Sequence, residues 1–312
     1  MHRRNFLRSA LTAGTALAAS ATVIEPHSLV AREPILRRGG PRFQLGLAAY
    51  SLRQYFSFMK GKPKKPLTDG PAIDMVGFMD YCVDQGVDAA ELTSYFFRAD
   101  ADDDYFRDLK RQAFLRGLAI SGTAIGNNFT VGRGERLDKQ IQDALDWIDR
   151  AAVLGAPHIR FFAGTGKELA EDPGRIAEAV EAMQQCAARA GEHGIFLGIE
   201  NHGNLTSDQM LELMQRIESP WVGVNLDSGN FFSDDPYRDL ERVAPYTVNV
   251  QVKVSMQSAD RKRYPADLDR VAKILADSGY QGYVNLEYED DEPYANIPAA
   301  LDRLRNALEK AV

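Results

Sequence analysis

Short apolar runs alternate with longer amphipathic stretches about eight times between Phe43 and Ala311. The apolar runs have the length of buried strands, and the stretches between them have helical spacing. Strands that are separated by helices pair in parallel, with the helices packed outside the sheet. We therefore predict an α/β fold, a (β/α)8 TIM barrel over residues 42–312. An open, doubly wound sheet is the alternative, but no early strand is followed by a Gly-x-Gly-x-x-Gly turn.

Several of the later apolar runs end in polar side chains. The run 195–199, for example, stops abruptly at Glu-Asn-His. The carboxyl ends of barrel strands meet at one rim, where TIM-barrel enzymes carry their active sites. We therefore expect the polar side chains of successive strand ends to converge there. They are Glu200, His202, Asp227, Gln251, Lys253 and Glu287.

Four of these side chains predict a metal site. Glu200, Asp227 and Glu287 would repel one another at close range, and burying them without a partner is costly. A shared divalent cation removes both problems, and the carbonyl oxygen of Gln251 completes an all-oxygen ligand set. Such a set favours Mn²⁺ or Mg²⁺ over Zn²⁺, which prefers nitrogen and sulfur ligands.

Three residues on the earlier strands are further candidates for the same rim. Tyr50 follows the first apolar run, and Glu91 lies near the end of the second. Arg160 falls within the fourth run, where it either binds a substrate oxygen or neutralises Glu91. We expect all three to contribute to substrate binding.

The charge balance restricts the partners. Lys and Arg number 37 and Asp and Glu number 44, a net charge of −7. Without residues 1–21, which hold three Arg and no acid, the net charge becomes −10. An acidic protein of this kind is not expected to bind nucleic acid.

The two cysteines, Cys82 and Cys186, fall in helical patterns and are interpreted as buried thiols.

The first 21 residues have the pattern of an export signal. A twin-arginine motif at residues 3–8 precedes a mildly apolar stretch and an Ala-Ser-Ala cleavage site at residues 19–21. The apolar stretch is too short and too weakly apolar for a stable membrane span. We predict a twin-arginine signal peptide at 1–21, a linker at 22–41, and a periplasmic or extracellular protein. Whether the chain forms a homo-oligomer stays open.

Five segments of the chain resemble the sugar-phosphate isomerase/epimerase superfamily of xylose-isomerase-like TIM barrels. The segments are LGLAAYSLR (45–53), LGIENHGN (197–204), VGVNLDSGN (222–230), VQVKV (250–254) and YVNLEYE (283–289). In that family the metal ligands are a Glu, an Asp, a His and a Glu on strands five to eight. Glu200, Asp227 and Glu287 match this set, whereas Gln251 stands where the family has its histidine. Asn230 replaces a second family histidine, three residues after Asp227.

The resemblance implies a metal-dependent enzyme that moves a proton at the carbon next to a sugar carbonyl. It makes Glu200 and Glu287 the acid/base pair, and makes Lys253 and His202 stabilisers of substrate or oxyanion. Asn230 joins them as a substrate-binding candidate. The substrate is a small carbohydrate, and export favours one without a phosphate group.

Two other functions stay open at this point. One is a lyase that dehydrates an inosose or cleaves a keto-glycoside after the same enolisation. The other is a sugar-binding barrel without catalysis. A zinc-dependent endonuclease IV is excluded, because its trinuclear site uses many histidines and this chain has five.

Overall fold

The computed structural model describes residues 33–67 and 72–312. The predicted signal peptide at 1–21 and residues 22–32 of the predicted linker lie outside the described residues. Residues 33–41 precede β1 without forming a helix or strand, and they pack against the barrel. The Ile35 amide donates to the Pro245 carbonyl, and the Gln281 side chain donates to the carbonyls of Arg38 and Gly40.

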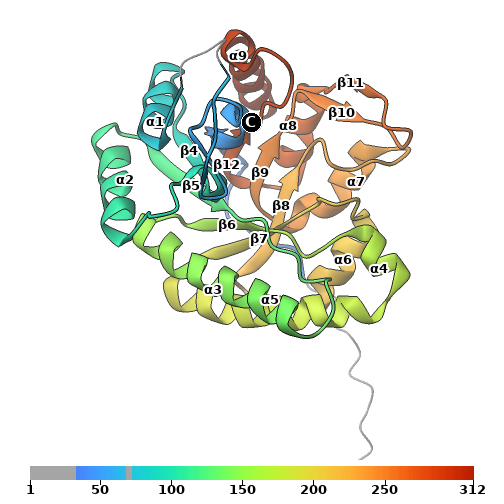
Figure 1. Ribbon diagram of the computed structural model, residues 1–312. Helices are drawn as coiled ribbons and strands as arrows, with labels where there is room; N and C mark the ends of the chain where they lie inside the picture. The colour runs from blue at the N-terminus through green and yellow to red at the C-terminus, as the bar shows by residue number, and fades with distance from the viewer. Residues whose placement is uncertain (1–32, 68–71) are drawn as a thin grey trace, which may run out of the picture. The chain divides into compact units, whose positions relative to one another are not determined.

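Eight parallel strands close into a barrel in the order β1-β12-β9-β8-β7-β6-β5-β4 (Figure 1). The barrel strands are β1 (Arg42–Ala48), β4 (Ala89–Thr93), β5 (Ala119–Ala124), β6 (His158–Phe161), β7 (Phe196–Glu200), β8 (Val222–Asp227), β9 (Thr247–Val252) and β12 (Gln281–Leu286). This closed barrel confirms the predicted (β/α)8 fold and excludes the open sheet.

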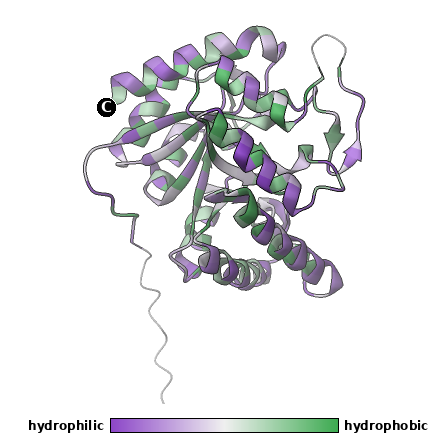
Figure 2. Ribbon diagram, turned by 90° about the vertical axis from the view of Figure 1, so that its left-hand side faces the viewer, coloured by the Kyte–Doolittle hydropathy of each residue, from purple (hydrophilic) through white to green (hydrophobic). Residues whose placement is uncertain are grey.

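Helices surround the barrel, and Figure 2 shows both hydrophilic and hydrophobic residues along their length. The helices are α1 (Met75–Asp84), α2 (Asp103–Leu115), α3 (Glu135–Leu154), α4 (Gly166–Glu171), α5 (Gly174–His193), α6 (Ser207–Arg216), α7 (Pro236–Val243), α8 (Leu268–Asp277) and α9 (Pro293–Ala311). Short 3-10 turns are η1 (Ala49–Leu52), η2 (Ser94–Phe96) and η3 (Ala244–Tyr246). Tyr50 therefore lies in η1, just past the first strand rather than in it.

Local sequence signals set the helix ends. Asp102 caps α2 by accepting a hydrogen bond from the Tyr105 amide, and Thr206 forms a capping box with Gln209 at the start of α6. Gly194 ends α5 with φ of 69°, a left-handed conformation that glycine adopts without strain. The chain can therefore turn directly from α5 into β7, the strand that carries Glu200.

The apolar core lies between the strands and the helices. Leu197 and Ile199 of β7 are fully buried there, and Phe97, Phe106 and Trp147 pack as an aromatic cluster near α2 and α3. Cys82 and Cys186 are buried free thiols, as predicted. Within the described part of the chain, no helix combines the length and apolar content needed to cross a membrane.

Two small hairpins project from the strand connections. β2 (Phe58–Met59) pairs with β3 (Lys62–Pro63) after the first strand, and β10 (Ser255–Gln257) pairs with β11 (Arg263–Pro265) after β9. The first hairpin lies in the long segment between β1 and α1. It brings residues remote from the later strands to the mouth of the barrel.

The inside of the barrel is polar. A chain of hydrogen bonds crosses it from Ser121 to Asn285, Asn249 and Asn225. These residues come from β5, β12, β9 and β8, so the bonds link strands that are not all neighbours. Because each amide has a partner, burying them does not leave an unsatisfied group. This ladder forms the floor beneath the carboxyl ends of the strands.

Candidate active site

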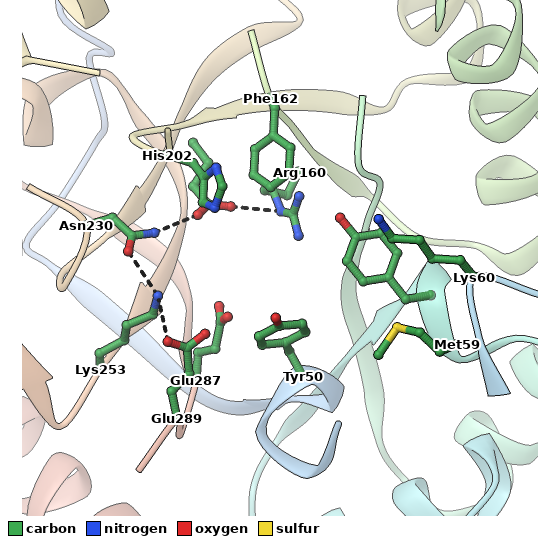
Figure 3. Close-up of a pocket in the computed structure, with 12 residues that line it drawn as sticks. Tyr50, Met59, Lys60, Arg160, Phe162, His202, Asn230, Lys253, Glu287 and Glu289 are labelled. Atoms are coloured by element: carbon green, nitrogen blue, oxygen red, sulfur yellow. Dashed lines mark hydrogen bonds and ion pairs between the residues drawn. The ribbon is translucent and has the colours of Figure 1, made fainter. Parts of the chain in front are cut away.

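A pocket of about 370 Å³ opens at the carboxyl ends of the barrel strands (Figure 3). Seven of the predicted site residues line it: Tyr50, Arg160, Glu200, His202, Asn230, Lys253 and Glu287. Three others, Glu91, Asp227 and Gln251, lie fully buried and do not line it. The convergence expected from the strand ends is therefore found, with the predicted residues in two layers.

Glu200 is held on both sides. Its Oε2 lies 2.9 Å from Arg160 Nε, and its Oε1 accepts a hydrogen bond of 2.8 Å from the Asn230 side chain. Arg160 is itself fixed by a 2.6 Å hydrogen bond to the Ile125 carbonyl. Burial raises the pKa of Glu200 above its usual range, although Arg160 opposes this shift. Within the described part of the chain, Arg160 thus forms its ion pair with Glu200 and not with Glu91.

Asp227 lies beneath the pocket and is completely enclosed. Its Oδ1 accepts a hydrogen bond of 2.8 Å from the Gly229 amide. Its Oδ2 accepts one of 2.9 Å from the Asn230 side chain and lies 2.9 Å from Lys253 Nζ. All of these neighbours are hydrogen donors, so Asp227 is a fully satisfied carboxylate.

Lys253 is surrounded by acceptors. Besides Asp227, its Nζ lies 3.1 Å from Asn230 Oδ1 and 3.3 Å from Glu289 Oε2. Burial by itself lowers the pKa of this ammonium, but Asp227, Glu287 and Glu289 together raise it well above its usual value. Lys253 is therefore a permanent positive charge in the wall of the pocket.

Glu287 differs from the other acids of the site. Its side chain is 7% exposed and faces the pocket, yet no hydrogen bond or ion pair to it is found among the described residues. Burial raises the pKa of this carboxyl well above its usual range, and Lys253 only partly opposes the shift. Figure 3 shows the carboxyl directed into the open centre of the pocket. A buried, unpaired carboxyl of this kind can take up and release a proton.

Gln251 and Glu91 form the layer below. The Gln251 amide donates a 2.8 Å hydrogen bond to Glu91, and its carbonyl oxygen accepts one of 2.6 Å from Asn225. Asn249 also donates to Glu91, at 3.3 Å. Burial raises the pKa of Glu91 to about 7, opposed chiefly by Arg160. These two residues therefore join the polar floor instead of reaching a ligand in the pocket.

Aromatic rings form one wall of the pocket. His202 stacks on Phe162 with 4.2 Å between ring centroids, and the Arg160 guanidinium lies 4.1 Å from the Phe162 centroid. Burial lowers the pKa of His202 to about 4, with Arg160 adding to the effect. The imidazole is thus neutral at pH 7. Tyr50 meets Tyr95 edge to face at 6.4 Å, which extends the wall.

Sequence reasoning did not assign five of the residues that line the pocket. They are Met59, Lys60, Tyr95, Phe162 and Glu289. Phe162 and Glu289 each lie two residues beyond an assigned position, Arg160 and Glu287, so the two-residue period of a strand was a usable signal. Met59, Lys60 and Tyr95 lie in a hairpin and a 3-10 turn, which no strand pattern could place.

The donor set does not fit the predicted divalent cation. A single amide group, the Nδ2 of Asn230, bridges Glu200 and Asp227, and the Lys253 ammonium contacts Asp227 as well. The Gln251 carbonyl is already engaged by Asn225. In residues 33–67 and 72–312, no group of three or more Asp, Glu, His or Cys side chains is arranged to hold a metal ion. The four-oxygen metal cluster expected from the sequence is therefore not formed by these residues, because hydrogen donors lie between its acids.

Solved structures with the same fold are numerous. A D-psicose 3-epimerase from Clostridium cellulolyticum H10, solved with D-tagatose, is 16% identical over 85% of this chain and 99% of its own, with a TM-score of 0.66. A 3-keto-D-glucoside 4-epimerase from E. coli is 14% identical over 85% and 100%, with a TM-score of 0.61.

A third structure, described as a xylose isomerase-like TIM barrel protein from Mycobacterium smegmatis in complex with magnesium, is 17% identical over 86% of this chain and 97% of its own, with a TM-score of 0.66.

No curated protein is detectably similar in sequence. The family profile described as xylose isomerase-like TIM barrel matches residues 79–308. This match covers most of the chain, and the protein therefore belongs to the xylose isomerase-like TIM barrel family.

Proposed function

We propose that the protein is a sugar isomerase or epimerase that transfers a proton at the carbon next to a carbonyl group. The observation that carries the proposal is Glu287, a buried carboxyl that faces the pocket without a partner among the described residues. A general acid/base needs a pKa near the working pH and access to the substrate. Burial raises the pKa of Glu287 from its usual acidic range, and its position in the pocket gives it access to a substrate.

Glu200 is the second proton-transfer group in this proposal. It belongs to β7, which is three positions from β12 in the barrel order, so the two carboxyls reach the pocket from different strands. In the proposed reaction one carboxylate removes the proton and its electron pair moves to the carbonyl oxygen, giving an enediolate. Return of a proton from the other side inverts the carbon. Arg160 and Asn230 hold Glu200 in a fixed orientation for this step.

The remaining lining residues suit an uncharged sugar. Three acids and three cations line the pocket, namely Glu200, Glu287, Glu289, Lys60, Arg160 and Lys253. Such a balance gives no surplus of positive charge for a phosphate group. The stacked His202 and Phe162 offer an apolar face next to polar groups, as small-molecule sites commonly do. Two of the structural neighbours, a D-psicose 3-epimerase and a 3-keto-D-glucoside 4-epimerase, agree with this substrate class.

The test is a screen of keto-sugars and keto-glycosides in D₂O. Exchange of a carbon-bound proton for deuterium, with a product inverted at one centre, is the expected result. Loss of water or of an aglycone would instead identify the lyase. Saturable sugar binding without any exchange would identify a non-catalytic barrel. Wild-type protein and Glu287→Gln are compared throughout, because only the carboxyl differs between them.

We also propose that the protein is exported by the twin-arginine route to the periplasm or beyond. The support is the arginine pair at residues 3 and 4, which lies outside the described residues. The equal numbers of acids and cations in the pocket favour an uncharged substrate, which is consistent with that location.

A further inference from the structure

We infer that the Lys253 ammonium is the resident cation of this site, in the place of a divalent metal ion. The part of this inference that concerns the reaction rests on the proposed function. The part that concerns metal binding stands on the contacts alone and can be tested without a substrate.

The first argument is the position of Lys253. Its Nζ is within 3.3 Å of two carboxylates, those of Asp227 and Glu289, and within 3.1 Å of Asn230 Oδ1. Asp227 is fully buried, so its charge requires a fixed counterion. An ammonium has three donors, and the three neighbours account for all of them. Lys253 thus neutralises the buried charge of Asp227, as a bound metal ion would otherwise do.

The second argument is the Asn230 amide. Its two N–H groups face Glu200 Oε1 at 2.8 Å and Asp227 Oδ2 at 2.9 Å, while its oxygen accepts from Lys253. This set of bonds fixes which end of the amide faces the acids, because the reverse orientation would set its oxygen against two carboxylates. The space between the two acids is filled by hydrogen donors. A metal ion there would meet N–H groups where it needs lone pairs.

The third argument is the layer below. The Gln251 carbonyl accepts from Asn225, and the Gln251 amide donates to Glu91. Asn225 continues into the ladder through Asn249 and Asn285. To turn toward a metal ion, Gln251 would have to break both bonds, which would leave the buried Asn225 amide and the buried Glu91 carboxylate each without one hydrogen-bond partner. Leaving buried polar groups unpaired is costly.

In the proposed reaction, Lys253 stabilises the negative charge that develops on the enediolate. The electron pair released from carbon moves to the carbonyl oxygen, and a fixed ammonium nearby stabilises that charge. Glu289 is the most exposed of the three partners of Lys253, with its side chain 31% exposed, and it makes the longest contact. A substrate oxygen can therefore replace Glu289 without disturbing Asp227.

The test begins with the wild-type chain, treated with EDTA, dialysed, and titrated with MnCl₂ or MgCl₂ in a calorimeter. We expect no saturable binding below millimolar concentrations and no change in melting temperature. Binding of one Mn²⁺ per chain at micromolar concentration would overturn the inference. Any exchange activity found in the sugar screen is expected to survive EDTA. Its loss in EDTA and recovery with Mn²⁺ would also overturn it.

Variants then test the assignment to Lys253. Lys253→Met leaves Asp227 and Glu289 without their cation, and we expect Mn²⁺ to raise the melting temperature of this variant and not that of the wild type. Lys262→Met is the matched control, because this lysine is exposed on the loop between β10 and β11. An equal Mn²⁺ effect on all three proteins would contradict the inference.

If Lys253→Met does not fold, Asn230→Asp serves the same purpose. It replaces the bridging donor by a third carboxylate, so it is expected to gain Mn²⁺ binding that the wild type lacks. If the sugar screen finds no activity, the proposed function falls. The metal titrations still test whether Lys253 takes the place of a metal ion.

Discussion

Arg160 Nε lies 2.9 Å from Glu200 Oε2, and both side chains are almost completely buried. Removal of one member of a buried ion pair leaves the other charge unpaired, which typically costs about 3–5 kcal/mol. We expect Arg160→Met to lower the free energy of unfolding by an amount of that order, as measured in urea.

The double variant Arg160→Met/Glu200→Gln is the control for this pair. Because it removes both charges, it should lose less stability than Arg160→Met alone. Equal losses in the two proteins would show that packing around Arg160, and not the pair, accounts for the cost.

Glu287→Gln is expected to abolish most of the proton exchange. General acid/base groups typically contribute about 100- to 10,000-fold in rate, and the amide cannot carry the proton. Stability should not fall, because the carboxyl has no hydrogen bond or ion pair to lose among the described residues. The checks are kcat/KM in the deuterium assay and the urea midpoint. Unchanged kcat/KM in a folded variant would rule out Glu287 as the base.

His158 makes the stability of the protein depend on pH. Neither ring nitrogen has a hydrogen-bond partner among residues 33–67 and 72–312, and burial lowers the pKa of the imidazole from 6.5 to about 3, with Arg160 contributing. Below pH 6.5, His158 therefore binds a proton in the unfolded chain but stays neutral in the folded chain until the pH approaches 3. Stability from this group is complete above pH 6.5 and is lost as the pH falls toward 3, by about 1.4 kcal/mol per pH unit.

The comparison that isolates this effect is His158→Gln against wild type at pH 7 and pH 5. The wild type should lose about 2 kcal/mol more than the variant between these two values. Parallel pH curves for the two proteins would refute the assignment.

The flanking Gly122 and Gly198 leave room for the His158 ring, since a Cβ on either would lie within 3 Å of a His158 ring nitrogen.

Export is expected to depend on the two arginines at positions 3 and 4. Replacing both by Lys keeps the charge but removes the motif, so the variant should accumulate in the cytoplasm. Cell fractionation followed by an immunoblot measures this. The same double change at Arg32 and Arg38, which lie outside the motif, is the matched control and should leave export intact. Periplasmic protein in equal amounts from both would exclude the twin-arginine route.

The sequence predicted the barrel because eight strand-helix units admit few other arrangements. It also predicted seven of the twelve residues that line the pocket. Residues Glu200, Asp227 and Glu287 follow apolar runs that must be parallel strands, and parallel strands in a barrel share one carboxyl end. The register bears this out, since Asp227 is the direct neighbour of Gln251 across β8 and β9.

The predicted metal ligation depended on contacts that strand position cannot supply. Gln251 lies in β9 and Lys253 lies one residue past its end, two residues further along the chain. The Gln251 side chain nevertheless contacts Asn225 and Glu91, whereas Lys253 contacts Asp227 and Glu289. The direction of the Gln251 amide is decided by Asn225 on β8 and Glu91 on β4, which strand position alone does not specify. Met59 and Lys60 likewise reach the pocket only because a hairpin folds over the barrel mouth.

The sequence by itself therefore determined the fold and the group of acids at the rim. Only the tertiary structure decided how those acids are neutralised, because that depends on hydrogen-bond partners brought together from distant parts of the chain.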